Sequence, residues 1–229
     1  MNWLSGSWAL IGELTLTHLT IAVPAIIASV LIAVPIGAWA QRSKGVGGVV
    51  LSFLTVLYAV PSLPLLIVIP VLSGIALRSR VNMVVVLTIY GIAVLIRQCA
   101  EAFAAVPADV LESADALGMS RLRRFCTVEL PLAVPVIVSG TRVVITSTVS
   151  LVTIGAFIGV RSLGTLFTDG FQRGLTVEVL AGLVMTIALA LLLDALAVGL
   201  GALVPYLFFI LLPVLLMLYL KIHCQDSCH

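Results

Sequence analysis

Long apolar segments constrain this chain of 229 residues more than any other feature of its sequence. Five of them, at about 16–40, 49–76, 82–100, 131–157 and 177–201, are each long enough for a helix that crosses a bilayer with some tilt. A further apolar run follows at about 203–220. None of the segments alternates polar and apolar residues as a membrane barrel strand does. We therefore expect an all-α membrane protein, a bundle of five core transmembrane helices with a possible sixth.

The composition supports an integral membrane protein and argues against several other classes. Hydrophobic residues make up 62% of the sequence and charged residues 10%, whereas a soluble domain carries roughly 25% charged residues. The net charge of +2 is too small to indicate binding to nucleic acid. The sequence has no Gly-rich phosphate loop, no zinc-protease His-Glu pair and no Gly-x-Ser-x-Gly elbow. We therefore expect no catalytic residue, no cofactor and no metal ion in this chain. We expect membrane lipid to surround it.

Prolines and glycines indicate where the expected helices bend or stop. In a bundle, neighbouring helices and hydroxyl side chains can satisfy the carbonyls that a proline leaves free. We expect kinks, a partly opened second helix and a tight glycine-rich turn over residues 43–48. The prolines concerned are Pro24, Pro35, Pro61, Pro64 and Pro70.

The distribution of lysine and arginine predicts a topology, because cytoplasmic loops carry an excess of these residues. One side of the expected bundle holds Arg42, Lys44, Arg97, Arg121, Arg123 and Arg124, and the other holds Arg78, Arg80, Arg161 and Arg173. This bias predicts an extracytoplasmic N-terminus and a cytoplasmic loop over residues 112–131. The N-terminal segment has no basic region ahead of its apolar part, so we expect the first helix to be retained.

Residues Glu112–Pro131, ESADALGMSRLRRFCTVELP, form a polar, charged stretch between apolar segments. We call this stretch the 112–131 segment. Just before it, residues 107–109 (Pro-Ala-Asp) are typical of a helix start, and Gly118 is typical of a helix end. Ser120 can cap a second short helix that contains Arg121–Arg124. A membrane protein with a loop of this kind is expected to contact something in the aqueous phase.

The spacing within the 112–131 segment resembles the EAA signature of ATP-binding-cassette (ABC) importer permeases. That signature begins Glu-Ala-Ala, continues with a glycine four residues after the second alanine, and has Leu-Pro near its end. The matching residues are Glu112, Ser113, Ala114, Gly118, Leu130 and Pro131. The resemblance implies a coupling helix that docks in a groove of an ATPase, with Arg121, Arg123 and Arg124 in the same loop. The alternative is an interfacial helix whose arginines contact lipid headgroups.

Other stretches resemble one subgroup of these permeases, which imports glycine betaine, carnitine, choline and related osmoprotectants. They are YAVPSL at 58–63, PLAVPVI at 131–137 with Gly-Thr-Arg at 140–142, and AFIG at 156–159. The resemblance covers about residues 10–202 and implies an ABC transporter transmembrane domain with the MetI-like permease fold. Arg161 and Ser162 depart from it, because the subgroup tends to have glycines there. These two positions lie in a loop expected to face outward.

The resemblance also implies the partners of the chain. They are two cytoplasmic ATPase subunits, a second permease subunit that is identical or homologous, and an extracytoplasmic substrate-binding protein. ATP and Mg²⁺ would bind the partner ATPase, so this chain would not itself be an enzyme. The implied location is the cytoplasmic (inner) membrane of a bacterium.

Charged and hydroxyl residues inside the apolar segments are candidates for a pathway or a helix interface. Arg142 lies in the fourth segment, where a charge is costly, and Asp194 in the fifth is its expected partner by sign. We expect a structural ion pair rather than direct contact with substrate. The hydroxyls of the candidate set can either line a polar path or support close helix packing; the set comprises Pro61, Ser62, Thr146, Ser147 and Ser150.

Three further features leave their interpretation open. Residues 203–229 form an atypical apolar tail that could be a sixth helix, an interfacial segment or the product of a shifted reading frame. His18, near the outer interface, is expected to lie on a helix surface. Aromatic residues make up only 7% of the chain, so no aromatic cage for a quaternary ammonium group is evident.

Two alternatives compete with an osmoprotectant permease. One is a permease for amino acids such as methionine, which shares the EAA loop. The other is a secondary transporter or channel that works alone, for which acidic relays inside the membrane or inverted repeats would be expected. Only Asp194 offers anything of that kind.

Overall fold

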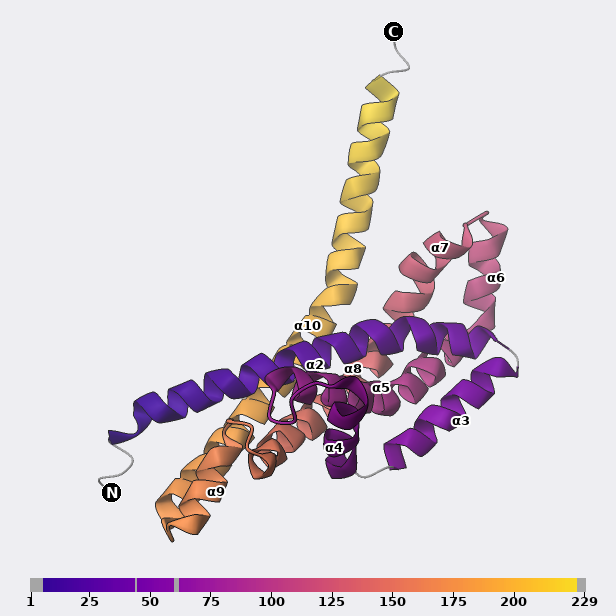
Figure 1. Cartoon of the computed structure of the whole chain (residues 1–229). Helices are drawn as coiled ribbons and strands as arrows, with labels where there is room; N and C mark the ends of the chain where they lie inside the picture. The colour runs from indigo at the N-terminus through magenta and orange to yellow at the C-terminus, as the bar shows by residue number, and fades with distance from the viewer. Residues whose placement is uncertain (1–5, 44, 60–61, 226–229) are drawn as a thin grey trace.

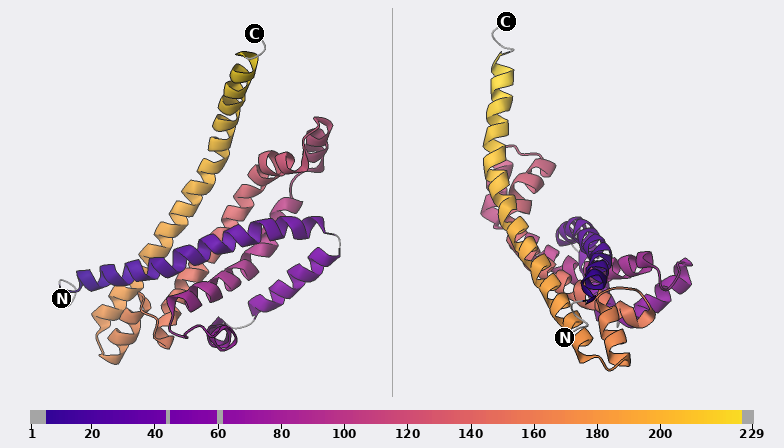
Figure 2. Two further views of the ribbon diagram at one scale, coloured as in Figure 1. Left: turned by 45° about the horizontal axis from the view of Figure 1, so that its top comes forward. Right: turned by 90° about the vertical axis from the view of Figure 1, so that its left-hand side faces the viewer.

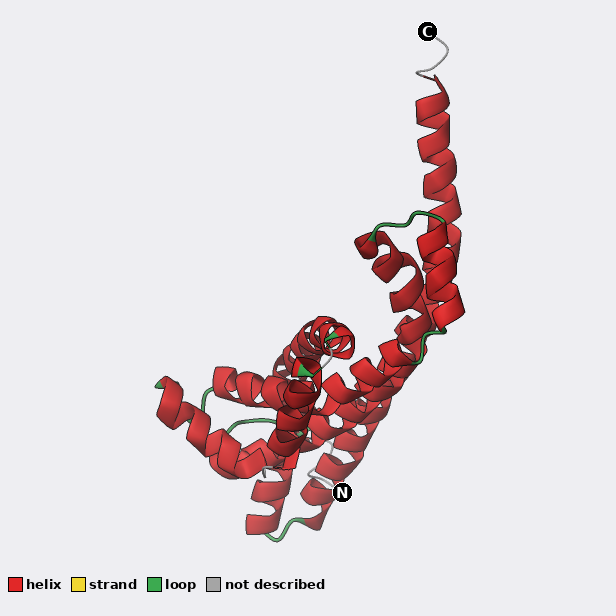
Figure 3. Cartoon of the chain, turned by 90° about the vertical axis from the view of Figure 1, so that its right-hand side faces the viewer, coloured by secondary structure: helices red, strands yellow, loops and turns green. Residues whose placement is uncertain are grey.

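The computed structural model describes residues 6–43, 45–59 and 62–225, and the described residues form helices joined by short turns, with no strand (Figure 3). The side chains of residues 55, 57–59, 62, 63 and 204–225 lie outside the description. Within these limits four helical stretches are long and apolar enough to cross a membrane: Trp8–Arg42, Arg80–Ala104, Arg121–Ile158 and Thr176–Leu203. The expected all-α membrane fold is therefore confirmed, whereas the expected five spans are not all found as single helices.

The core lies where α2 (Trp8–Arg42) packs against α5 (Arg80–Ala104) and both contact α8 (Leu130–Ile154) (Figure 1). Small residues allow α2 and α5 to approach closely. The Ser29 hydroxyl on α2 donates to the Ala25 carbonyl at 2.7 Å and lies 3.2 Å from the Thr88 carbonyl on α5. Such close contact between helices replaces the hydrophobic driving force that lipid removes.

The second apolar segment, expected as one partly opened helix over 49–76, forms two helices. These are α3 (Val46–Ala59) and α4 (Ser62–Ser73), and neither is long enough to span a membrane alone. The break between them contains Pro61, which lies outside the described residues. Asn82 at the start of α5 fixes α4, because its amide donates to the carbonyls of Leu66 and Leu77 at 3.2 and 3.1 Å.

The polar connection from α5 to α8 holds α6 (Ala108–Ala116), α7 (Arg121–Arg124) and the π-helical turn η1 (Phe125–Glu129). Helical structure runs unbroken from Arg121 into the apolar segment that the sequence predicts at about 131–157. Pro131 has no N–H to donate to the carbonyl of residue 127, and a π turn directly before it accommodates the lost hydrogen bond.

At the opposite end of the bundle, η2 (Gly155–Ile158) and α9 (Gly164–Gln172) precede α10 (Thr176–Gln225), and the start of α2 lies close by (Figure 1). A small second core of Ile11, Leu14, Leu163, Leu166 and Leu189 joins these elements. His18 was expected on a helix surface and is fully buried instead. The burial of His18 could not be predicted from the sequence, because the residues that pack against the N-terminal part of α2 lie far away along the chain.

The apolar tail continues α10 rather than forming a separate sixth helix. α10 runs for 50 residues, and Figures 1 and 2 show its C-terminal half extending away from the other helices.

The close contact between α2 and α5 gives a first prediction. A Cβ added at Gly37 would lie 2.5 Å from Cβ of Cys99 and 3.0 Å from the Ile96 carbonyl oxygen. Because backbone on α5 cannot yield easily, Gly37→Val should lower the thermal midpoint of the purified protein by about 5 °C. Gly12→Val is the matched control, since nothing lies within 4 Å of its added Cβ. Equal midpoints for the two variants would contradict the packing.

Candidate functional site

The first half of the 112–131 segment is fixed by a Schellman cap at the end of α6. Gly118 has φ +69, which favours glycine, and its N–H donates to the Asp115 carbonyl at 2.9 Å. The Met119 N–H donates to the carbonyl of buried Ala114 at 3.2 Å. Gly118 therefore ends the helix as predicted.

A second turn follows at once. Ser120 caps α7, and its hydroxyl accepts from the Arg123 N–H at 3.4 Å, as the sequence predicted. Two leucines of this region are almost free of contacts: Leu117 is 76% exposed and Leu122 is 74% exposed. Leu117 occupies the C-cap position of α6. Both leucines are therefore accessible to a partner on this surface.

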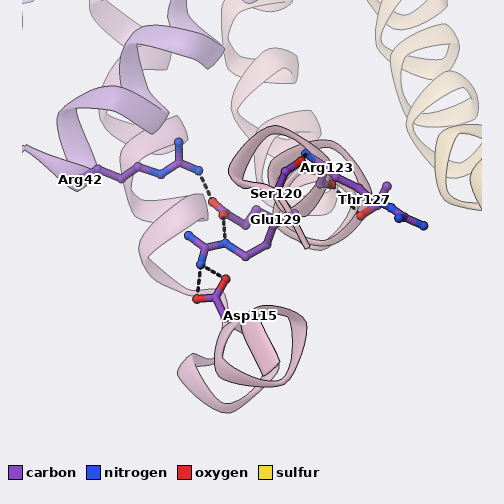
Figure 4. A network of polar contacts seen from close by, with 7 residues as sticks. Arg42, Asp115, Ser120, Arg123, Thr127 and Glu129 are labelled. Carbon is purple, nitrogen blue, oxygen red and sulfur yellow. Dashed lines mark hydrogen bonds and ion pairs between the residues drawn. The ribbon is translucent and has the colours of Figure 1, made fainter. Parts of the chain in front are cut away.

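A chain of charged contacts holds the segment against the bundle (Figure 4). The Arg124 guanidinium lies 2.6 Å from Oδ1 of Asp115 and also contacts Oδ2. Its Nε donates to Oε1 of Glu129 at 3.0 Å, and Oε2 of Glu129 accepts from Arg42 at the end of α2. The Glu129 side chain is only 7% exposed, so both arginines are needed to compensate its burial.

Aromatic contacts support the same junction. The Arg42 guanidinium lies 5.1 Å from the centre of the Phe125 ring, a distance at which cation–π attraction contributes. The Phe125 ring lies 5.5 Å from that of Phe103 on α5. The π turn thus contacts α2 and α5 at once, and a movement of the 112–131 segment would act on both helices.

The predicted coupling residues occupy different positions in this arrangement. Glu112 and Ser113 are exposed on α6, and the Ser113 hydroxyl donates to the Asp109 carbonyl at 2.7 Å. Arg121 and Arg123 are exposed, whereas Arg124 is the centre of the ion-pair network. Leu130 and Pro131 begin α8. Arg42, Asp115 and Glu129 also belong to this network, although they were not among the predicted coupling residues. The available signal for Glu129 was its position as an acidic residue directly before an apolar span.

Inside the spanning part, Arg142 and Asp194 form the expected ion pair between α8 and α10. Nε of Arg142 donates to Oδ1 of Asp194 at 2.7 Å, and a terminal nitrogen donates to Oδ2 at 2.8 Å. The Arg142 side chain is 50% exposed and that of Asp194 is 20% exposed. The pair therefore lies at the surface of this single subunit rather than in its interior.

The candidate hydroxyls gather near that pair. A pocket of about 330 Å³ lies between α8 and α5. It is lined by Thr146, Ser147, Ser150 and Leu151 of α8 and by Tyr90 of α5. Thr146 also donates to the Arg142 carbonyl at 2.8 Å. Tyr90 was not anticipated from the sequence. Pro61 and the side chain of Ser62 lie outside the described residues, so their place relative to the pocket stays a prediction.

Within the described residues, no group of three His, Cys, Asp or Glu side chains could hold a metal ion. The cysteine and histidine side chains at the end of the chain lie outside the description.

The Arg142–Asp194 pair gives a second prediction. Neutralising either partner leaves an unpaired charge in an apolar segment, whereas neutralising both does not. Arg142→Gln and Asp194→Asn should each lower the yield of folded protein and its thermal midpoint, and the double variant should recover most of the loss. Size-exclusion profiles and melting curves in one detergent measure both. Normal single variants, or a double variant that is worse than either, would contradict a structural pair.

Comparison with known proteins identifies relatives of similar length. Residues 25–220 match the model of the family described as binding-protein-dependent transport system inner membrane component. The choline transport system permease protein OpuBB of Bacillus subtilis is 33% identical over 189 residues, which cover 80% of this chain and 84% of that protein. The glycine betaine/carnitine/choline permease OpuCB of the same organism is 31% identical, covering 77% and 80%.

A longer relative and a solved structure are also similar to this chain. The glycine betaine/proline betaine permease ProW of Escherichia coli is 29% identical, covering 86% of this chain and 53% of its own length. A chain of the MetNI methionine ABC transporter, solved in an inward-facing conformation, superimposes with a TM-score of 0.76 over 86% of this chain and 97% of its own, at 18% identity. That likeness confirms the MetI-like fold. The chain belongs to the family of inner membrane components of binding-protein-dependent transport systems.

Proposed function

We propose that this chain is the permease subunit of an ABC importer for small quaternary-ammonium osmoprotectants such as glycine betaine, choline, carnitine and proline betaine. The names of the relatives that match most of its length support this substrate class. A second permease, identical or homologous, two ATPase subunits and an extracytoplasmic binding protein complete the importer. ATP and Mg²⁺ bind the ATPases, and this chain carries no hydrolytic step.

The single observation that carries the proposal is the ion-pair network around Glu129. A segment that only binds lipid headgroups would not need Arg124 to contact both Asp115 and Glu129, although Arg121 and Arg123 stay exposed. The network makes the 112–131 segment and the end of α2 one mechanical unit. ATP-driven closure of the ATPases, acting on exposed Glu112, Leu117 and Leu122, would shift this unit and switch the bundle between two arrangements.

The topology follows from the same unit. Because Arg42 contacts Glu129, the end of α2 and the 112–131 segment lie at one end of the bundle. The coupling role puts this end in the cytoplasm and the start of α2, with α9, outside. The positive charge bias of the sequence supports the same orientation.

A methionine permease is the second candidate, since a methionine transporter shares the fold. That likeness rests on 18% identity and supports the fold alone. A transporter working alone has less support, because Asp194 is engaged by Arg142 and is not an isolated acidic group.

Uptake of labelled solute tests the proposal. Cells that carry or lack this chain, with its ATPase and binding protein present in both, should differ in osmotically stimulated uptake of glycine betaine. Excess choline or carnitine should compete and excess methionine should not. Uptake that is independent of the chain would exclude the substrate class, and dominant inhibition by methionine would favour the second candidate.

A third prediction concerns the turn after α6. Gly118→Val should reduce uptake by roughly tenfold or more, because a β-branched residue at φ +69 costs enough to displace the docking surface. Gly118→Asn is the matched control and should keep most of the uptake, since asparagine tolerates this conformation. Both variants should reach the membrane in normal amounts. Equal uptake by the two would show that the turn conformation does not matter.

Glu112→Lys tests the docking contact itself. Glu112 is exposed on α6, so the change should leave the fold intact while abolishing uptake. Glu101→Gln, at an exposed residue of α5, is the control. Normal uptake by the Glu112→Lys variant would remove this residue from the coupling surface.

A further inference from the structure

A second pocket lies at the other end of the bundle from the 112–131 segment. It has a volume of about 680 Å³, within the range of small-molecule sites, and is formed by η2, the following loop and α9. Three phenylalanines from two elements share it: Phe157, Phe167 and Phe171. This grouping of aromatic residues is not evident in the sequence, because they lie in a region of short helices, where spacing along the chain does not predict which rings line the same pocket.

The aromatic rings are available to a solute. Phe157 is 76% exposed and Phe171 is 85% exposed, although large apolar side chains at the aqueous end of a bundle are usually covered. Aromatic faces attract quaternary ammonium groups, which offer no N–H to bind but carry a diffuse positive charge. Exposed rings around a hollow are therefore suited to a methylated cation.

The charges of the pocket are of both signs. Asp169 on α9 lines it and, within the described part of the chain, forms no ion pair. Arg161, in the loop between η2 and α9, also lines the pocket. A terminal nitrogen of its guanidinium lies 3.2 Å from Oε1 of Glu13, and both side chains are largely exposed. Nε of Arg78 would lie 3.0 Å from a Cβ at Gly159, another lining residue. A carboxylate and a guanidinium in the lining, with the Arg78 side chain beside Gly159, match a zwitterion better than a simple cation.

The loop that carries Arg161 is anchored rather than loose. The buried Ser162 hydroxyl donates to the Val152 carbonyl at 3.1 Å and accepts from the Gly164 N–H at 3.1 Å. The Ser162 N–H donates to the Thr165 hydroxyl at 3.1 Å. Arg161 and Ser162 are the two positions at which the subgroup tends to have glycines. The hydrogen bonds of Ser162 fix the loop, and the fixed loop holds the Arg161 guanidinium at the rim of the pocket.

We propose that this pocket is a low-affinity site for a zwitterionic quaternary ammonium solute. The methylated nitrogen contacts the phenylalanine rings near Asp169, and the carboxylate faces Arg161. The proposal rests on the proposed function, since it adds a substrate site to the outer end of the permease. A small solute is favoured over a docked protein because the rings line a hollow that also contains an unpaired carboxylate.

Saturation-transfer NMR on the permease with its ATPase in nanodiscs, without binding protein, tests the site. The N-methyl protons of glycine betaine should show transfer, and choline and 3,3-dimethylbutyrate, which each lack one charge, should show less. Asp169→Asn and Phe167→Leu should each reduce the betaine signal roughly fivefold, as loss of a desolvated cation contact implies. Arg161→Gln should weaken betaine binding and leave choline unchanged.

Two control variants keep the result interpretable. Phe53→Leu alters an exposed phenylalanine on α3, and Glu101→Gln alters an exposed carboxylate on α5. Both should retain the wild-type signal, and all variants should share one elution volume. No transfer in the wild type, or equal transfer in the wild type and all variants, would overturn the site. If cells still need this chain for betaine uptake, the proposed function would stand despite that failure.

Discussion

The placement of Glu129 between two arginines is the interaction on which the arrangement of this chain depends. A carboxylate that is only 7% exposed needs compensation, and Arg42 and Arg124 supply it from opposite directions. One arginine ends α2, and the other lies between α6 and the π turn. The polar segment is thereby joined to α2, which packs against α5 more extensively than any other pair of described helices packs. The polar segment and the packed helices are thus held together by one buried carboxylate.

The two ends of the bundle differ in the side chains that they expose. The 112–131 end presents exposed leucines and a fixed turn, which suit a protein partner. The α9 end presents a hollow with aromatic rings and charges of both signs, which suits a solute. Between them lie the Arg142–Asp194 pair, whose arginine is half exposed, and the hydroxyl pocket between α8 and α5.

Local signals in the sequence predicted the parts of the structure that local physics decides. Gly118 ends α6 and Ser120 caps α7, because a left-handed turn and a cap each depend on a few neighbouring residues. The Arg142–Asp194 pair was predictable because an unpaired charge in an apolar segment is costly, and few partners of opposite sign exist.

Contacts between distant segments could not be predicted in this way. Arg42 and Glu129 are 87 positions apart, and only the packing of α2 beside α5 and α8 brings them together. The burial of His18 and the meeting of three phenylalanines depend on the same tertiary arrangement. The second apolar segment has the length of a span, but its division into α3 and α4 shows that length alone does not fix a continuous helix.

A double-mutant cycle between Arg42 and Glu129, with ATP-driven uptake of glycine betaine as the readout, tests the central claim most directly. Arg42→Gln, Glu129→Gln and the double variant would be compared at equal amounts in the membrane, with ATP hydrolysis measured in parallel. The account predicts that each single change lowers uptake per ATP hydrolysed and that the double variant is no worse than the poorer single one. Losses that multiply, or normal uptake in both single variants, would contradict a shared coupling role for these residues.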